Sequence, residues 1–186
     1  MVPRARLVLA SASPQRKAIL EQLGISFTVQ PADVEELTQG DPAEVVVENA
    51  RRKVAAVPGD LVLGCDTEVH LDGKVYGKAS DEAHAERYLR ELSGRTHQVL
   101  SGIALRECGA ERSAVAVTDV TFRRLDDAAL AWYINTGEWR DRAGAYAIQG
   151  RGSALVERIE GDFWNVVGLP VPKLIELAPN LVTDRD

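Results

Sequence analysis

The feature that most constrains the fold is the stretch 7–24, LVLASASPQRKAILEQLG, which predicts a strand, a tight polar turn and a helix. Residues 7–10 are a short apolar run of the buried-strand type. Ser13 followed by Pro14 is typical of an N-cap and a first helical position. Gly24 favours a helix end, because glycine adopts the left-handed backbone conformation found there. A strand in this chain therefore leads directly into a helix N-terminus.

Polar groups gather at that predicted N-terminus. Several groups that bind phosphate would converge on one place there: free backbone N–H groups, the hydroxyls of Ser11 and Ser13, and the cations Arg16 and Lys17. Such a place suits a phosphate group. An ordinary strand-to-helix connection with a serine cap is the alternative, and caps of this kind are common. The local pattern leaves both interpretations open.

The rest of the chain predicts an α/β protein with a mixed sheet, because helices and strands alternate in the first half and a hairpin-rich region follows. Asp41 and Pro42 begin a helix, Asp72–Gly73 is a hairpin turn signal, and Ser80 is expected to cap a helix. The expected helices cover residues 41–57, 81–92, 126–135 and a segment from 170. The expected strands cover residues 25–29, an apolar run from 61 that ends at Asp66, and residues 98–106, 113–124 and 153–159.

Composition limits the class of protein. The 186 residues, 45% of them apolar and 27% charged, are typical of a soluble chain with one core, so we expect a single domain over 1–186. No apolar run is long enough to cross a membrane and no signal peptide is apparent, which favours the cytoplasm. A net charge of −6 argues against a general nucleic-acid binder. Cys65 and Cys108 lack metal-type spacing and are expected to be small buried residues.

Asp66 is the strongest catalytic candidate. The apolar run from Leu61 leads straight into it, and a carboxylate at the end of a buried strand is costly unless it is paired, hydrogen-bonded or bound to metal. A structural cap on the following turn is the alternative. Lys78, at the base of the 72–73 hairpin, is expected to lie near Asp66. Lys53 lies four residues after Asn49 and projects from the same side of its helix, although a lone helical lysine usually faces solvent.

An acidic loop precedes the 41–57 helix. Asp33, Glu35 and Glu36 would suit a divalent ion, and a solvated loop is the alternative.

Six motifs in order carry a resemblance to a known family. They are LASASPQR at 9–16, NARRK at 49–53, GCDTEVHLDGKVYGK at 64–78, LSGRTHQV at 92–99, AGAYAIQGRG at 143–152 and NVVGLP at 165–170. Together they resemble the Maf family of nucleoside triphosphate pyrophosphatases over almost the whole chain. The resemblance implies an α/β fold with a mixed sheet in two lobes around a central cleft, similar to the inosine triphosphate pyrophosphatases.

The resemblance also implies an activity and a cofactor. A nucleoside triphosphate would be hydrolysed to the monophosphate and pyrophosphate with a divalent metal ion, most simply Mg²⁺, with Mn²⁺ or Co²⁺ as alternatives. Asp66 matches the family's catalytic base. Glu36, with Glu35 as the alternative, would join Asp66 as a metal ligand. A homodimer is a reasonable expectation for the family.

Substrate-binding residues follow by position. Arg16, Lys53 and Lys78 match the family's phosphate-binding cations. Thr67 and Gln149 match the positions that sort substrates and here look like the branch acting on dTTP and UTP.

Three positions depart from the family's pattern. Gln15 stands where the dTTP/UTP branch has an arginine tied to pyrimidine preference, so a looser base preference is expected. Ala79 replaces a proline and Ala147 replaces a glycine, changes that affect loop stiffness more than chemistry. Two alternatives stay open: a nucleotide-binding regulator of septum formation without essential turnover, and a broad pyrophosphatase for modified nucleotides.

Overall fold

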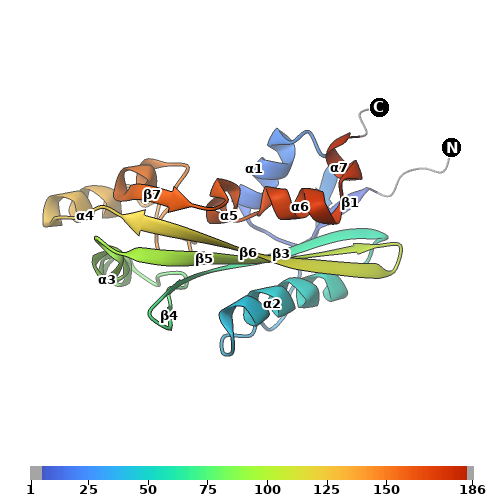
Figure 1. Cartoon of the computed structure of the whole chain (residues 1–186), viewed down its shortest axis with the longest axis horizontal. Coiled ribbons are helices and arrows are strands. Elements are labelled where there is room, and N and C mark those ends of the chain that lie inside the picture. Colours follow the sequence, from blue (N-terminus) through green and yellow to red (C-terminus); the bar gives the residue numbers. More distant parts are fainter. Residues whose placement is uncertain (1–5, 184–186) are drawn as a thin grey trace. The chain divides into compact units, whose positions relative to one another are not determined.

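The computed structural model describes residues 6–183 (Figure 1). The chain divides into two compact units. Within the described range, the first unit comprises residues 6–66, 101–116 and 168–183, and the second comprises residues 67–100 and 117–167. Strands β3 (Leu61–Leu71), β5 (Thr96–Glu107) and β6 (Ala110–Phe122) each contribute residues to both units. Among the described residues, no helix is both long enough and apolar enough to cross a membrane.

The remaining elements belong to one unit each. The first unit contains β1 (Leu7–Leu9), α1 (Pro14–Gln22), β2 (Phe27–Val29), α2 (Pro42–Ala56), α6 (Val171–Leu177) and α7 (Asn180–Thr183). The second contains β4 (Lys74–Val75), α3 (Glu82–Leu92), α4 (Asp127–Ile134), the 3-10 helix η1 (Arg151–Leu155), β7 (Val156–Glu160) and α5 (Phe163–Val167).

The strands confirm the predicted mixed sheet. Their order is β2-β1-β3-β5-β6-β7, and β4 pairs with β3 outside this path. Strand β1 is parallel to both β2 and β3, with Val8 opposite Val62, whereas β3–β4 and β6–β7 are antiparallel. Asp72 and Gly73 both have positive φ, as the predicted two-residue hairpin turn requires. The α/β class predicted from the alternating pattern is therefore confirmed.

Helix α2 packs unusually close to the strands of the first unit. A Cβ atom on Gly102 of β5 would lie 2.1 Å from the carbonyl oxygen of Val46, and one on Gly64 of β3 would lie 2.3 Å from that of Ala50. Figure 1 shows α2 on one side of these strands, with α1 and α6 on the other. Because only glycine leaves room for this approach, α2 holds its inward side chains against β3.

Three local expectations were wrong. Asp81, not Ser80, caps α3, because the Asp81 carboxylate accepts from the His84 backbone N–H at 2.8 Å. The expected strand from Ser153 begins only at Val156, after η1. Cys108 is exposed at a hairpin turn with φ 49°, while Cys65 is buried as expected.

Candidate functional site

Asp66 lies in the middle of β3. The sequence places it at the end of a strand, but β3 continues to Leu71, so Asp66 caps no turn. The residue is only 8% exposed. Its Oδ1 accepts a hydrogen bond from Lys53 Nζ at 2.7 Å, and its Oδ2 accepts one from Asn49 Nδ2 at 2.9 Å. An ionised carboxylate only accepts hydrogen bonds, and both of its partners here are donors.

Lys53 is buried, so the alternative of a solvent-facing lysine was wrong. Its ammonium lies 2.7 Å from Asp66 Oδ1 and 2.7 Å from Glu36 Oε1, and it donates to the Cys65 carbonyl at 3.4 Å. The Lys53 side chain is 10% exposed, whereas that of Glu36 is 49% exposed. One cation is therefore held between Glu36 and Asp66, the two carboxylates expected from the sequence to bind a metal ion.

Asn49 is the polar residue at this site that the predictions missed. It is 1% exposed, and besides Asp66 it binds the backbone of Leu37 through both amide atoms. Two sequence signals could have found it: its place in the motif NARRK at 49–53, and its spacing of four residues from Lys53, which places both side chains on one face of α2.

The β1–α1 turn brings four predicted residues together. Ser11 Oγ accepts from Arg16 Nη1 at 2.8 Å and from the Ser13 backbone N–H at 3.3 Å. Arg16 Nε donates to the Gly168 carbonyl at 2.8 Å, and Arg16 is only 8% exposed. Ser13 is the N-cap residue by position, but its hydroxyl donates to Gln15 Oε1 at 3.0 Å and does not cap α1. Arg16 thus fixes Ser11 on this turn.

The other three predicted residues belong to the second unit. Thr67 follows Asp66 on β3 and is half-buried. Lys78 is exposed and forms an isolated antiparallel bridge with Ala143. Gln149 is exposed in a turn closed by the hydrogen bond from Gly150 N–H to the Ala147 carbonyl. The expected nearness of Lys78 to Asp66 stays a prediction.

The second unit contains a buried pair of a histidine and a tyrosine. His97 Nε2 and the Tyr146 hydroxyl are 2.9 Å apart, and His97 is 1% exposed. Burial lowers the pKa of His97 to about 4 and raises that of Tyr146. Both groups are therefore neutral at pH 7, so His97 brings no charge to a phosphate.

The carboxylates can hold part of a metal site. Among residues 6–183 no group of three or more His, Cys, Asp or Glu side chains could hold an ion. Mg²⁺, however, is commonly bound by one or two carboxylates together with substrate phosphates. Glu36 and Asp66 converge on the Lys53 ammonium, so their oxygens already face a common cation. The pair therefore fits a two-carboxylate magnesium site completed by substrate.

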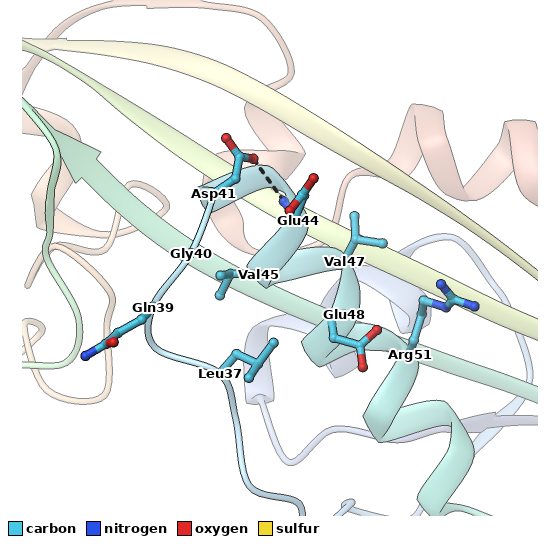
Figure 2. Close-up of a pocket in the computed structure, with 9 residues that line it drawn as sticks. All are labelled: Leu37, Gln39, Gly40, Asp41, Glu44, Val45, Val47, Glu48 and Arg51. Atoms are coloured by element: carbon cyan, nitrogen blue, oxygen red, sulfur yellow. Dashed lines mark hydrogen bonds between the residues drawn. The ribbon is translucent and has the colours of Figure 1, made fainter.

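A hollow of about 390 Å³ lies elsewhere on the first unit. Figure 2 shows its lining residues, Leu37, Gln39, Gly40, Asp41, Glu44, Val45, Val47, Glu48 and Arg51. None of them is a predicted site residue. Three carboxylates against one guanidinium would repel a triphosphate, so this hollow does not suit that ligand.

Comparison with known proteins identifies the class of chain to which this fold and site belong. The model of the Maf family, described as Maf-like protein, matches residues 6–181, and the chain belongs to this family. A protein of Anaeromyxobacter dehalogenans named dTTP/UTP pyrophosphatase is 49% identical, covering 92% of each chain. A protein of the same name from Thermococcus gammatolerans is 49% identical, covering 92% of this chain and 96% of its own. Another from Pyrococcus furiosus is 42% identical, covering 95% of this chain and 97% of its own.

A solved structure is more distantly similar. The HAM1 protein from Coxiella burnetii is 20% identical and aligns with a TM-score of 0.47, covering 66% of this chain and 75% of that one. The likeness is too weak to support an argument, so similarity to inosine triphosphate pyrophosphatases stays a prediction.

Proposed function

We propose that this protein hydrolyses dTTP and UTP to the nucleoside monophosphate and pyrophosphate, with Asp66 as the general base. Several relatives that are 42–49% identical over most of the chain carry the name dTTP/UTP pyrophosphatase. One observation supports Asp66 as the general base: its carboxylate is buried in the middle of a strand, and each of its two oxygens accepts a hydrogen bond. A buried charge held in one orientation is what a positioned base requires.

The reaction adds water across the anhydride that joins the α- and β-phosphates. Asp66 takes a proton from the attacking water, and each of its oxygens keeps acceptor capacity beyond its one hydrogen bond. Lys53 offers positive charge to the triphosphate, as do Arg16 and Lys78 in our proposal. Ser11 and Ser13 offer hydroxyls at the N-terminus of α1.

Glu36 and Asp66 would hold Mg²⁺, for which Mn²⁺ or Co²⁺ could substitute. When bound, the metal ion neutralises phosphate charge and polarises the phosphoryl group. The half-exposed Glu36 carboxylate would then give up its contact with Lys53, whose ammonium would keep its bond to Asp66 Oδ1 and face the phosphates.

Thr67, Gln149 and Gln15 would decide which base is accepted. Thr67 offers a hydroxyl, and Gln149 offers both a donor and an acceptor, which together match the carbonyls and N–H on a pyrimidine edge. Gln15 lacks the rigid charged fork of an arginine, so discrimination against other bases should be loose. CTP is then a further substrate.

A screen of triphosphates with pyrophosphate detection tests this proposal. Purified protein and Mg²⁺ are incubated with dTTP, UTP, CTP, GTP and 7-methylguanosine triphosphate, and kcat/KM is measured for each. We expect the highest values for dTTP and UTP. A preference for the methylated guanine nucleotide would overturn the assignment of the pocket, and absence of turnover on every triphosphate would favour a nucleotide-binding regulator.

Our proposal also includes a homodimer located in the cytoplasm. Sedimentation equilibrium of the purified protein checks the dimer, and fluorescence imaging of a tagged chain checks the location.

A further inference from the structure

Asn49 makes three hydrogen bonds with one buried amide. Its Oδ1 accepts from the Leu37 backbone N–H at 2.7 Å, and its Nδ2 donates to the Leu37 carbonyl at 3.0 Å and to Asp66 Oδ2 at 2.9 Å. These bonds use both amide hydrogens. Only this orientation of the amide satisfies Leu37. A flipped amide would turn Nδ2 toward the Leu37 N–H, donor against donor, and Oδ1 toward the Leu37 carbonyl, acceptor against acceptor. The amide therefore has a single favourable orientation.

The amide joins three separate segments. Asn49 belongs to α2, Asp66 belongs to β3, and Leu37 follows Glu36 in the loop before α2. The Glu36 carboxylate reaches the same Lys53 ammonium that binds Asp66. Because Glu36 and Leu37 are adjacent, the hydrogen bonds from Asn49 to the Leu37 backbone also restrain the backbone of Glu36.

Asn49 and Lys53 hold the two oxygens of one carboxylate. Asn49 binds Oδ2 of Asp66, and Lys53, one helical turn later on the same face of α2, binds Oδ1. Two donors on a rigid helix fix the rotation of the carboxylate plane about its terminal bond, which a single partner would leave free. General-base catalysis depends on that direction, and a misplacement of about 1 Å can cost roughly 100-fold in rate.

We propose that Asn49 is the positioning residue of the reaction, which sets the orientation of the Asp66 carboxylate and the place of the Glu36–Leu37 backbone. This inference rests on the proposed role of Asp66 as general base. Asn49 has no assigned contact with substrate or metal ion; it acts through Asp66.

Two variants test the inference. Asn49→Leu removes every hydrogen bond at similar volume. Asn49→Asp preserves shape and the acceptor for Leu37 N–H, but turns an acceptor toward the Leu37 carbonyl and Asp66. We expect both to lower kcat for dTTP by about 10- to 100-fold per folded molecule, with KM changed less than about threefold. Asn135→Leu, at an exposed asparagine after α4, is the matched control and should leave kcat unchanged.

A double-mutant cycle separates positioning from general structural support. If Asn49 acts through Asp66, adding Asn49→Leu to Asp66→Asn should slow the reaction less than about threefold further. Losses that multiply in the double variant would overturn the inference, as would an unchanged kcat in Asn49→Asp. If instead Asp66→Asn alone retained the wild-type rate, the proposed function of Asp66 would fail first, which is a distinguishable result.

Discussion

The ammonium of Lys53 lies 2.7 Å from Oδ1 of Asp66, although the two residues belong to different elements and are thirteen positions apart. The pair is nearly buried, with side chains 10% and 11% exposed. Such a pair is costly to break, because the remaining charge is left without its partner.

Lys53→Met should therefore weaken both folding and substrate binding. Removing the ammonium leaves Glu36 and Asp66 facing each other, which should lower the free energy of unfolding by about 3 kcal/mol. Losing a charged donor to phosphate should raise KM for dTTP about tenfold or more. Urea unfolding and steady-state kinetics measure the two effects. Lys173→Met, at an exposed pair with Glu176, is the control; equal behaviour of the two variants would contradict this role for Lys53.

Gly102→Ala should displace the helix that carries Lys53 and Asn49. The added methyl would lie 2.1 Å from the Val46 carbonyl oxygen, which is backbone and cannot turn aside. We expect a loss of about 3 kcal/mol in the free energy of unfolding, together with lower kcat. Gly77→Ala is the control because its added methyl meets no atom within 4 Å. If both variants unfold at the same urea concentration, α2 does not pack as closely as described.

His97 should make the protein less stable in mild acid. Burial lowers its pKa to about 4 in the folded chain, whereas an unfolded chain binds the proton below about pH 6.5. Between pH 6.5 and pH 4 the unfolded state therefore binds more protons than the folded state. The free energy of unfolding should fall by about 3 kcal/mol as the pH drops across this range. Urea unfolding from pH 8 to pH 4 checks this. The decline should be smaller in His97→Gln, and an identical decline would assign it to other groups.

Gln15→Arg should sharpen base preference. Gln15 Oε1 accepts from the Ser13 hydroxyl, and arginine has no acceptor with which to replace that bond. The guanidinium would instead offer a rigid donor fork to the substrate. We expect the ratio of kcat/KM for dTTP to that for GTP to rise about tenfold. Gln22→Arg, the same change at an exposed position on α1, is the control, and an unchanged ratio in Gln15→Arg would remove this residue from the pocket.

Local signals predicted most elements because the interactions that set them are local. Asp41 caps α2 by accepting from two backbone N–H groups, and Gly24 has the positive φ expected after α1. At the start of α3 two possible caps are adjacent, and Asp81 accepts the backbone bond while Ser80 donates to Asp81. Which of two adjacent residues caps a helix depends on backbone angles that the sequence does not display.

The site was harder to predict because its contacts are long-range. Asp66 was identified from the cost of burying a carboxylate, but its partners lie on α2, and pairing between separate elements leaves no local pattern. An asparagine in a helix interior is usually read as a weak helix former, so its own residue type gave Asn49 no functional role. The burial of Lys53 likewise follows from the close approach of α2 to Gly64 and Gly102, which is a tertiary property.

The most direct test is product analysis for wild type and Asp66→Asn with dTTP and Mg²⁺, using anion-exchange chromatography, alongside equilibrium binding of dTTP to both proteins. The variant keeps the shape of the side chain and removes only the basic carboxylate. We predict equal amounts of dTMP and pyrophosphate from the wild type, and a rate about 10²- to 10⁴-fold lower in the variant with binding retained. Formation of dTDP with orthophosphate, or a variant that keeps more than half of the wild-type rate, would contradict the account.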